Sequence, residues 1–275
     1  MSPLCPRRRL MLGGIGILGL TAISIGAWRL PFEKTERQIR QALLEELRPV
    51  SLKNCTLKRF GSAYDGGYLM CENLIDRVEA AYSYGVGPND EWGCDVSARY
   101  QVPVHQYDCF DPARPMCEAG AFVFHDECIG NRRKTSESRL FDTLANQISR
   151  NGDSGKRLVV KIDVEGAEWD ALMATSDAVL ERIDQLPMEL HGSHDRRFLR
   201  VVQKLKRTFY VVNLHFNNYS CDTETAPFPS RAYQVLLVNK RIGVLDTAAR
   251  TPSASALNAP DNPQLPDCQL NLDVR

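Results

Sequence analysis

Three carboxylates follow a run of β-forming residues in segment 157–172, RLVVKIDVEGAEWDAL. Asp163 closes this run, Glu165 lies in the turn after it, and Glu168 begins a helical pattern. A carboxylate near a helix N-terminus is stabilised by the backbone dipole, which accounts for Glu168 alone. That effect gives no reason for an acid at the end of a buried strand. Asp163 is therefore the first candidate for a functional residue.

Ligands of open α/β sheets bind outside the carboxyl ends of the strands, so residues closing the other predicted strands are the next candidates. In YSYGVGPNDEW, Gly85 and Gly87 would let the backbone approach a nucleotide-like ligand, although a plain turn explains them equally well. Asp90 could cap the helix that follows. Asp108 is placed to accept hydrogen bonds from a ribose diol, and Glu127 could line an adenine pocket.

One histidine and one turn add further candidates. His191, in MELHG, closes another predicted strand and could act as a base or an orienting group, with a structural histidine as the alternative. His194 gives an H-x-x-H spacing, but no third ligand is evident, so no metal site is predicted. The segment YDGGYLMC supplies Tyr64, Asp65 and Tyr68, placed to cover a cofactor or to present an acceptor. Its Asp-Gly-Gly is equally well a hairpin turn.

The elements that must position these residues alternate between β-rich runs and helical periodicity from about residue 55. We predict strands at 80–86, 102–108, 121–125, 157–163, 185–190, 209–216 and 233–239. Helices are expected at 138–152 and 196–207. The pattern predicts an α/β three-layer sandwich around a seven-stranded, mostly parallel sheet with a terminal antiparallel strand. This is the layout of the Rossmann-like class I methyltransferases.

The N-terminal region is predicted to carry an apolar span. A short basic tail, residues 1–9, precedes an uncharged apolar run at 10–28, which is long enough for a transmembrane helix. We predict a single-pass membrane anchor, with a cleaved signal segment and export as the alternative. An amphipathic segment at 29–54 is expected to form a helical stalk or a helix on the domain edge. The main domain would occupy 55–245, and the Ala/Pro/Ser-rich tail at 246–275 would be irregular.

Charge and cysteine content narrow the partners and the compartment. The 275-residue chain has 34 basic and 34 acidic side chains, so nothing global points to nucleic acid as a partner. All of its nine cysteines except Cys5 lie beyond the apolar span, an even set that fits an oxidising compartment, with reduced buried thiols as the alternative. Cys55 and Cys71 flank the ends of the candidate hairpin, and we predict that they pair if the domain is exported.

The segment KIDVEGAEWDAL closely resembles the signature of the FkbM-like methyltransferases, which use S-adenosylmethionine and are best associated with O-methylation. LKRFGSAYDGGYLMC, YSYGVG and AYQVLLVNK are similar to a branch of methyltransferase-like proteins that often carry an N-terminal hydrophobic segment. The resemblance covers about residues 55–240. The family's first loop, D-x-G-x-N-x-G, is SYGVGPNDEW here, with Ser83 in place of the leading acid.

This resemblance implies S-adenosylmethionine as cofactor and a hydroxyl of a sugar, glycan or small molecule as acceptor. Gly85 and Gly87 would flank the methionine part of the cofactor, Asp108 would hold its ribose, and Asp163 would lie beside the reacting methyl. The predicted catalytic residues are Asp163, Glu165 and His191. The predicted cofactor-binding residues are Gly85, Gly87, Asp90, Asp108, Glu127 and Asp163. The predicted substrate-binding residues are Tyr64, Asp65, Tyr68 and Glu168.

Two other functions fit the same sequence. A single N-terminal span, a stalk and an α/β domain are also the common layout of glycosyltransferases, in which Asp163-Val164-Glu165 could act as an acidic metal–nucleotide motif. A non-catalytic binding domain that kept the fold is the other alternative. The irregular first loop and a compartment with uncertain cofactor supply both favour it.

Overall fold

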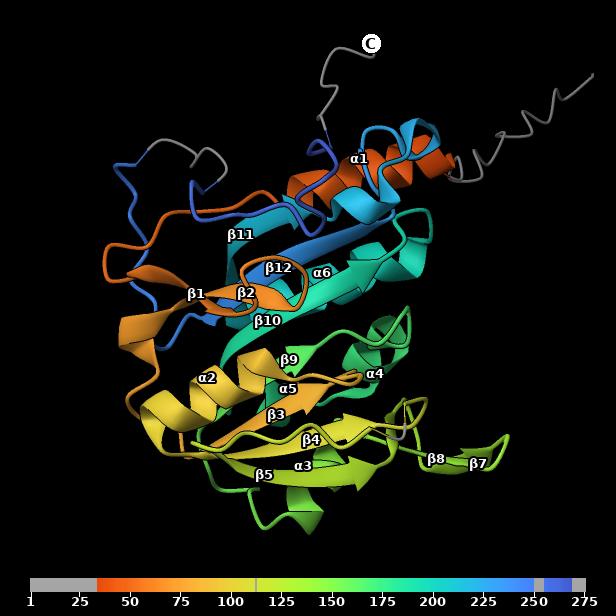
Figure 1. Cartoon of the computed structure of the whole chain (residues 1–275). Helices are drawn as coiled ribbons and strands as arrows, with labels where there is room; N and C mark the ends of the chain where they lie inside the picture. The colour runs from red at the N-terminus through yellow and green to blue at the C-terminus, as the bar shows by residue number, and fades with distance from the viewer. Residues whose placement is uncertain (1–33, 112, 250–254, 269–275) are drawn as a thin grey trace, which may run out of the picture. The chain divides into compact units, whose positions relative to one another are not determined.

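The computed structural model describes residues 34–111, 113–249 and 255–268. Seven strands form one sheet in the order β11-β12-β10-β9-β3-β4-β5 (Figure 1). Their bounds are β3 (Ala80–Tyr84), β4 (Pro103–Asp108), β5 (Ala121–Asp126), β9 (Leu158–Ile162), β10 (Ile183–His191), β11 (Phe209–Phe216) and β12 (Ala232–Asn239). All seven predicted strands are present, and the pairs from β10 to β5 are parallel, which confirms the predicted sheet.

The antiparallel strand is β12, and it lies between β10 and β11 rather than at the spatial edge of the sheet. The connection from β11 to β12 contains only two short 3-10 turns, η2 (Asn218–Ser220) and η3 (Thr223–Thr225). A parallel return would need a longer crossover, usually a helix. The chain therefore turns back beside β11 and fills the position between it and β10.

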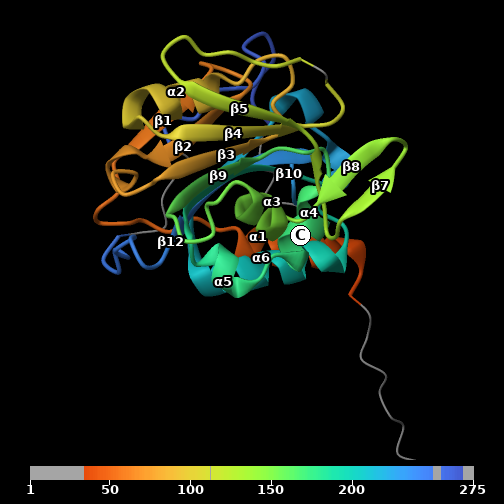
Figure 2. The same ribbon diagram turned by 90° about the horizontal axis from the view of Figure 1, so that it is seen from below.

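Two layers cover the sheet (Figure 2). One face carries α1 (Glu36–Glu46), α3 (Leu144–Arg150), α4 (Glu168–Ala174), α5 (Asp177–Leu180) and α6 (Arg196–Thr208). The other carries α2 (Glu91–Tyr100) and the hairpin of β1 (Leu57–Gly61) and β2 (Gly67–Cys71). Side chains of β3 alternate between the two faces of the sheet, and each face has its own hydrophobic core. Tyr82 belongs to one core and Ala81 to the other. The three-layer prediction is confirmed.

The predicted helix at 138–152 is shorter in the structure. It begins only at Leu144, after Thr143, whose hydroxyl accepts a hydrogen bond from the backbone N–H of Asn146. The preceding residues form β8 (Arg139–Asp142), which joins β6 (Cys128–Ile129) and β7 (Lys134–Ser136) in a small three-stranded sheet. The helical spacing of Leu140 was therefore misleading, because pairing with β7 outweighs local periodicity. Helix α6 matches its prediction, and η1 (Glu72–Leu74) was not predicted.

The segment expected to form a stalk packs on the domain. Helix α1 begins with a capping box between Thr35 and Gln38, and Leu43 and Leu47 are fully buried in the core shared with the sheet. No helix within the described ranges, which start at residue 34, is long and apolar enough to cross a membrane. The predicted anchor at 10–28 lies outside the described residues.

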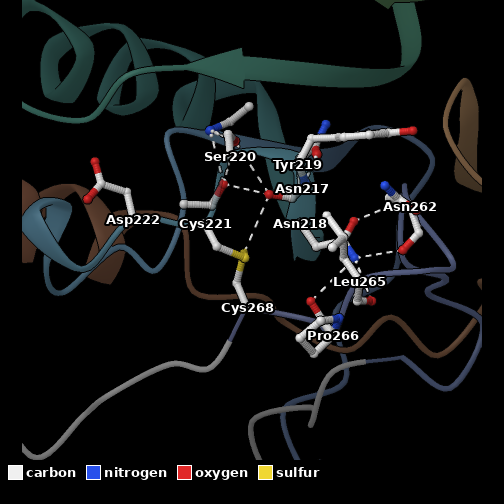
Figure 3. The surroundings of a disulfide bond; sticks show 12 residues. Asn217, Asn218, Tyr219, Ser220, Cys221, Asp222, Asn262, Leu265, Pro266 and Cys268 are labelled. Carbon is white, nitrogen blue, oxygen red and sulfur yellow. Dashed lines mark hydrogen bonds between the residues drawn. A yellow bond between two sulfur atoms is a disulfide. The ribbon is translucent and has the colours of Figure 1, made fainter.

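The described part of the C-terminal tail has no regular elements, as predicted, yet it is fixed to the domain. Cys268 is joined to Cys221 by a disulfide. Figure 3 shows Asn218 beside this bond, donating from its side chain to the carbonyls of Asn262 (2.9 Å) and Leu265 (3.0 Å). The tail is therefore irregular but held in place.

All eight cysteines beyond the predicted span form disulfides, and the predicted pair is among them. The bonds are Cys55–Cys71, Cys94–Cys117, Cys109–Cys128 and Cys221–Cys268.

We expect the C55A/C71A double variant to lose about 3 kcal/mol of unfolding free energy, because this cross-link restricts a loop in the unfolded chain. The two cysteines are 16 residues apart. Urea unfolding of variant and wild type measures the loss. The difference should vanish when both proteins are unfolded in a reductant. A loss that persists there would mean that side-chain packing, not the cross-link, is responsible.

Candidate functional site

The parallel register aligns the carboxyl ends of four strands. Tyr84 of β3 pairs with Tyr107 of β4 and with Ile162 of β9, and Ile162 pairs with Met188 of β10. The next residue along each strand therefore lies in one row at the carboxyl edge of the sheet. The members of this row are Gly85, Asp108, Asp163 and Glu189.

Three cavities open along this row. The large cavity, of about 800 Å³, includes Glu165, Glu189 and His191 in its lining. The loop cavity, of about 430 Å³, follows the first loop and includes Gly85 and Gly87. The aromatic cavity, of about 380 Å³, is lined mainly by aromatic and apolar side chains and by four of the predicted acids, Asp108, Glu127, Asp163 and Glu165. Asp163 lines all three cavities.

Gly85 occupies a position that no side chain could share. Its φ is +71°, and a Cβ built on it would lie 1.6 Å from the carbonyl oxygen of Asp163. Its own N–H donates to the carbonyl of Tyr107 (2.9 Å), and Lys161 Nζ donates to its carbonyl (2.7 Å). The glycine therefore permits β3 and β9 to meet closely where the cavities begin.

Asp108 is held by backbone donors. Its carboxylate accepts from the N–H groups of Gly87 (3.1 Å), Phe110 (2.9 Å) and Asp111 (3.0 Å). Burial favours the neutral acid, but these hydrogen bonds outweigh that effect and lower the pKa of Asp108. An ionised, fixed acceptor at the end of β4 suits a ribose diol.

Asp90 serves the fold more than the site. One of its oxygens accepts from Gly93 N–H (2.8 Å) at the start of α2 and from the hydroxyl of Ser83 (3.1 Å), and the other accepts from Gln106 Nε2 (2.9 Å). Its side chain therefore caps α2 and ties the first loop to β3 and β4. The predicted helix cap is confirmed. Asp90 also lines the loop cavity, so its contact with a cofactor stays a prediction.

Glu127 lines the aromatic cavity. It forms an ion pair with Arg150 of α3, which also pairs with the fully buried Asp142 (2.9 Å). Its placement agrees with the expected lining role.

Asp163 is surrounded by a hydroxyl and two basic groups. Tyr68 donates its hydroxyl to Oδ2 (2.8 Å), Lys161 Nζ lies 3.8 Å from the same oxygen, and His191 Nε2 lies 4.0 Å from Oδ1. Burial and the charge of Asp163 raise the pKa of Tyr68, so it remains a donor. Tyr68 is buried and lines none of the three cavities, which corrects its predicted contact with substrate. It positions Asp163 instead.

Three carboxylates lie close to His191, two from the segment after β9 and one from β10. Glu165, at φ +53°, places Oε2 3.4 Å from His191 Nε2, and Glu168 places Oε1 3.3 Å from Nδ1. Glu189 lies 3.7 Å from Nε2. Burial lowers the pKa of His191, but Glu168 and the other acids outweigh it and raise the pKa to about 9. At neutral pH the ring therefore carries a proton, and the structure favours the orienting role over the base.

Glu168 does not reach the cavities. It is fully buried, and its carboxylate accepts from the N–H groups of Gly166 and His191, both at 2.8 Å. Its predicted role in binding substrate is corrected, because every contact serves to hold the turn and the histidine. Tyr64 and Asp65, the other two candidates from the β1–β2 hairpin, differ in their placement. Tyr64 lines none of the three cavities, whereas Asp65 lines both the large cavity and the loop cavity.

Sequence reasoning missed two acids beside the site. Glu189 is buried on β10, and alternation along the strand puts it on the same face as His191, a signal that the sequence contained. Asp261 is buried too, but the irregular tail that carries it gave no signal. Two sets of side chains could each hold a metal ion, with ligand atoms within 4.8 Å of one another: Asp163, Glu189 and His191, and Asp65, Glu189 and Asp261.

The remaining motif candidates do not join these sets. Among the described residues, neither set includes His194, so the H-x-x-H spacing forms no ligand pair. Neither includes Glu165, so Asp163-Val164-Glu165 does not gather both of its acids around one ion position.

No protein-family model matches the chain, and no curated protein has a sequence similar enough to count as a relative. The described residues form an α/β domain compatible with a Rossmann-like fold, with a polar site at the carboxyl edge of its sheet.

Proposed function

We propose that this protein is an S-adenosylmethionine-dependent methyltransferase of the FkbM-like kind, acting on a hydroxyl of a sugar, glycan or small molecule. The observation that carries the proposal is the position of Asp163, which lines all three cavities. A residue there can contact a donor held on one side and an acceptor held on the other. The strand order, with one antiparallel strand inserted beside the edge, also agrees with the class I methyltransferase layout.

The two smaller cavities suit the donor. The aromatic cavity offers Tyr107, Phe110 and Phe141 to an adenine ring, and Asp108 lies where a ribose diol would reach it. The loop cavity offers the backbone at Gly85 and Gly87 to the methionine part. Ser83 stands where the FkbM-like family has an acid at the start of this loop, and its hydroxyl donates to Asp90. The loop is therefore shaped by its glycines and by Lys161, which donates to the carbonyl of Gly85.

The large cavity suits the acceptor. When bound, S-adenosylmethionine supplies a methyl group on a positively charged sulfur, and its transfer is an in-line displacement that needs an oriented hydroxyl. Asp163 accepts the hydrogen bond of that hydroxyl and takes its proton as the new C–O bond forms. Tyr68 and Lys161 hold the carboxylate in place, and the charged His191 orients it from the other side.

A metal-dependent glycosyltransferase is the second candidate. One observation favours this function: ligand atoms of Asp163, Glu189 and His191 lie within 4.8 Å of one another, close enough to bind one metal ion. This function would require both a divalent metal and a sugar nucleotide, whereas methyl-donor binding should persist in EDTA.

The compartment is a further part of the proposal. Four disulfides support an oxidising or exported environment for the domain. Membrane attachment through residues 10–28 remains a proposal from the sequence alone.

A pair of tryptophan substitutions on one segment tests the donor site. Ala167 lines the aromatic cavity at the start of α4, and Ala174 lies exposed at the end of the same helix. We expect Ala167→Trp to fill the cavity and weaken S-adenosylmethionine binding by about 100-fold or more, and Ala174→Trp to leave it within about threefold. Calorimetric titration in EDTA measures both. Equal binding by the two variants would place the donor elsewhere.

A further inference from the structure

Two buried carboxylates beside the large cavity each have an oxygen without a partner. Glu189 is 5% exposed and Asp261 is 2% exposed. Among the described residues, no hydrogen-bond donor reaches Glu189 Oε2 or Asp261 Oδ2. A buried carboxylate oxygen left unpaired is costly, and either a bound proton or a bound cation removes that cost. Burial and the neighbouring acids raise the pKa of Glu189 to about 8 and the pKa of Asp261 to about 7, so a cation at these oxygens would take the place of protons.

Each acid is fixed in place by its other oxygen. Asn217 Nδ2 donates to Glu189 Oε1 (2.9 Å), and Gln234 Nε2 donates to Asp261 Oδ1 (3.0 Å). Both donors are neutral amides, which orient the carboxylates without balancing their charge. With Asp65, the two acids form a set whose ligand atoms lie within 4.8 Å of one another.

The basic side chains nearby do not neutralise this set. His191 is the nearest to Glu189, at 3.7 Å, but the same ring serves Asp163, Glu165 and Glu168. Lys161 pairs with Asp163 and donates to the carbonyls of Tyr84 and Gly85. Arg59 acts on Asp261 only at longer range, because its guanidinium donates to the carbonyls of Ser62 and Tyr64. In the described part of the chain, no ion pair within 4.0 Å joins a basic group to Asp261 or Asp65.

We propose that Asp65, Glu189 and Asp261 bind a hard divalent cation at the side of the large cavity. Three carboxylates supply only oxygen ligands, which suit Ca²⁺, Mg²⁺ or Mn²⁺ rather than Zn²⁺. The unpartnered Oε2 and Oδ2 atoms are the ligands that this ion satisfies.

The fold builds this site from three distant segments. Asp65 comes from the turn of the β1–β2 hairpin, Glu189 from β10, and Asp261 from the C-terminal tail. The backbone N–H of Asp65 donates to the carbonyl of Asp261 (3.3 Å), which joins the hairpin to the tail. The disulfide of Cys268 and the contacts of Asn218 with the tail, shown in Figure 3, keep that segment on the domain. The site therefore gives the irregular tail a function.

The cation also indicates which class of acceptor the large cavity binds. This inference about the acceptor rests on the proposed function. Asp65 and Glu189 line the large cavity, so coordination positions not filled by protein face the acceptor. A hard cation with open positions binds adjacent hydroxyl groups, such as those of a sugar ring. The acceptor that we infer is therefore a vicinal diol of a carbohydrate, bound through the ion with one hydroxyl presented to Asp163.

Thermal unfolding of the purified protein without donor tests the site directly. We expect addition of millimolar CaCl2 to protein first treated with EDTA to raise the Tm of the wild type by about 5 °C. MgCl2 and MnCl2 are the parallel arms. Glu189→Gln and Asp261→Asn should abolish the rise. In EDTA neither variant should melt below the wild type, because the amide keeps the oxygen that accepts from Asn217 or Gln234 and replaces only the oxygen that has no donor.

Glu224→Gln is the matched control, since Glu224 lies exposed in the lining of the same large cavity and loses the same charge. It should keep the full rise. No rise in the wild type with any of the three cations overturns the proposal, and so does a rise that both cluster variants retain. If the variants fail to fold, calorimetric titration of wild-type protein with CaCl2 decides, and absence of binding is the negative result. Donor binding is measured separately in EDTA, so failure of this site and failure of the methyltransferase proposal are distinguishable.

Discussion

Asp163→Asn is expected to lower the rate of methyl transfer by about 10²- to 10⁴-fold, the range that a positioned general base contributes. The asparagine keeps an oxygen that can accept the hydroxyl of Tyr68, so the geometry around it is retained. It removes the charge that takes the acceptor proton. Binding of S-adenosylmethionine should therefore change much less than the rate does.

Transfer of a radiolabelled methyl group from S-adenosylmethionine to a carbohydrate acceptor measures this loss, and calorimetry measures donor binding by the same variant. The matched control is Asp170→Asn, because Asp170 lies in the same segment but is exposed and pairs only with Arg197 on the surface. Its activity should match the wild type. Full activity in Asp163→Asn would contradict the catalytic role and would favour a non-catalytic domain for which this acid is dispensable.

Gly85→Ala is expected to cost about 3 kcal/mol or more of unfolding free energy and to abolish donor binding. The new Cβ would lie 1.6 Å from the carbonyl oxygen and 2.8 Å from the carbonyl carbon of Asp163. Both atoms belong to the backbone, so they cannot move aside as the end of a side chain can. The ends of β3 and β9 would have to separate, and the positive φ adds a further cost for alanine.

Gly155→Ala is the control for this substitution, because a Cβ at Gly155 meets no atom within 4 Å and no left-handed φ is required there. It should change stability by no more than about 0.5 kcal/mol. Urea unfolding followed by circular dichroism compares the two variants. A Gly85→Ala protein that unfolds at the wild-type urea concentration would show that the two strand ends are not held together as the structure places them.

The sheet could be predicted from the sequence because each of its strands is a short buried run with its own local signal. Once the strands were assigned, the rule that ligands bind at their carboxyl ends was enough to select Gly85, Asp108 and Asp163. The structure places all three in the row that lines the cavities. These residues were predictable because their position depends on where a strand ends and on nothing further away.

Residues whose surroundings depend on tertiary packing were assigned poorly. Glu168 and Tyr68 were expected to face substrate, but burial against His191 and Asp163 makes them positioning groups.

Asp261 shows the limit of sequence reasoning most clearly. Its segment has no periodicity. The disulfide of the tail, the hydrogen bonds of Asn218 and the donor Gln234, which pairs with Glu189 across the sheet, bring it beside Glu189. The partners in that contact lie far from it in the sequence. A site of this kind is therefore found only from the folded chain.

A crystal structure of the protein with S-adenosylhomocysteine tests the central claim most directly. The proposal predicts density across the aromatic and loop cavities, with the ribose on Asp108, the amino-acid part beside Gly85 and Gly87, and the sulfur directed at Asp163. The large cavity should stay open on the other side of that carboxylate. Crystals grown with saturating ligand that leave these cavities empty, or that bind it away from the carboxyl edge of β3 and β9, would contradict the account.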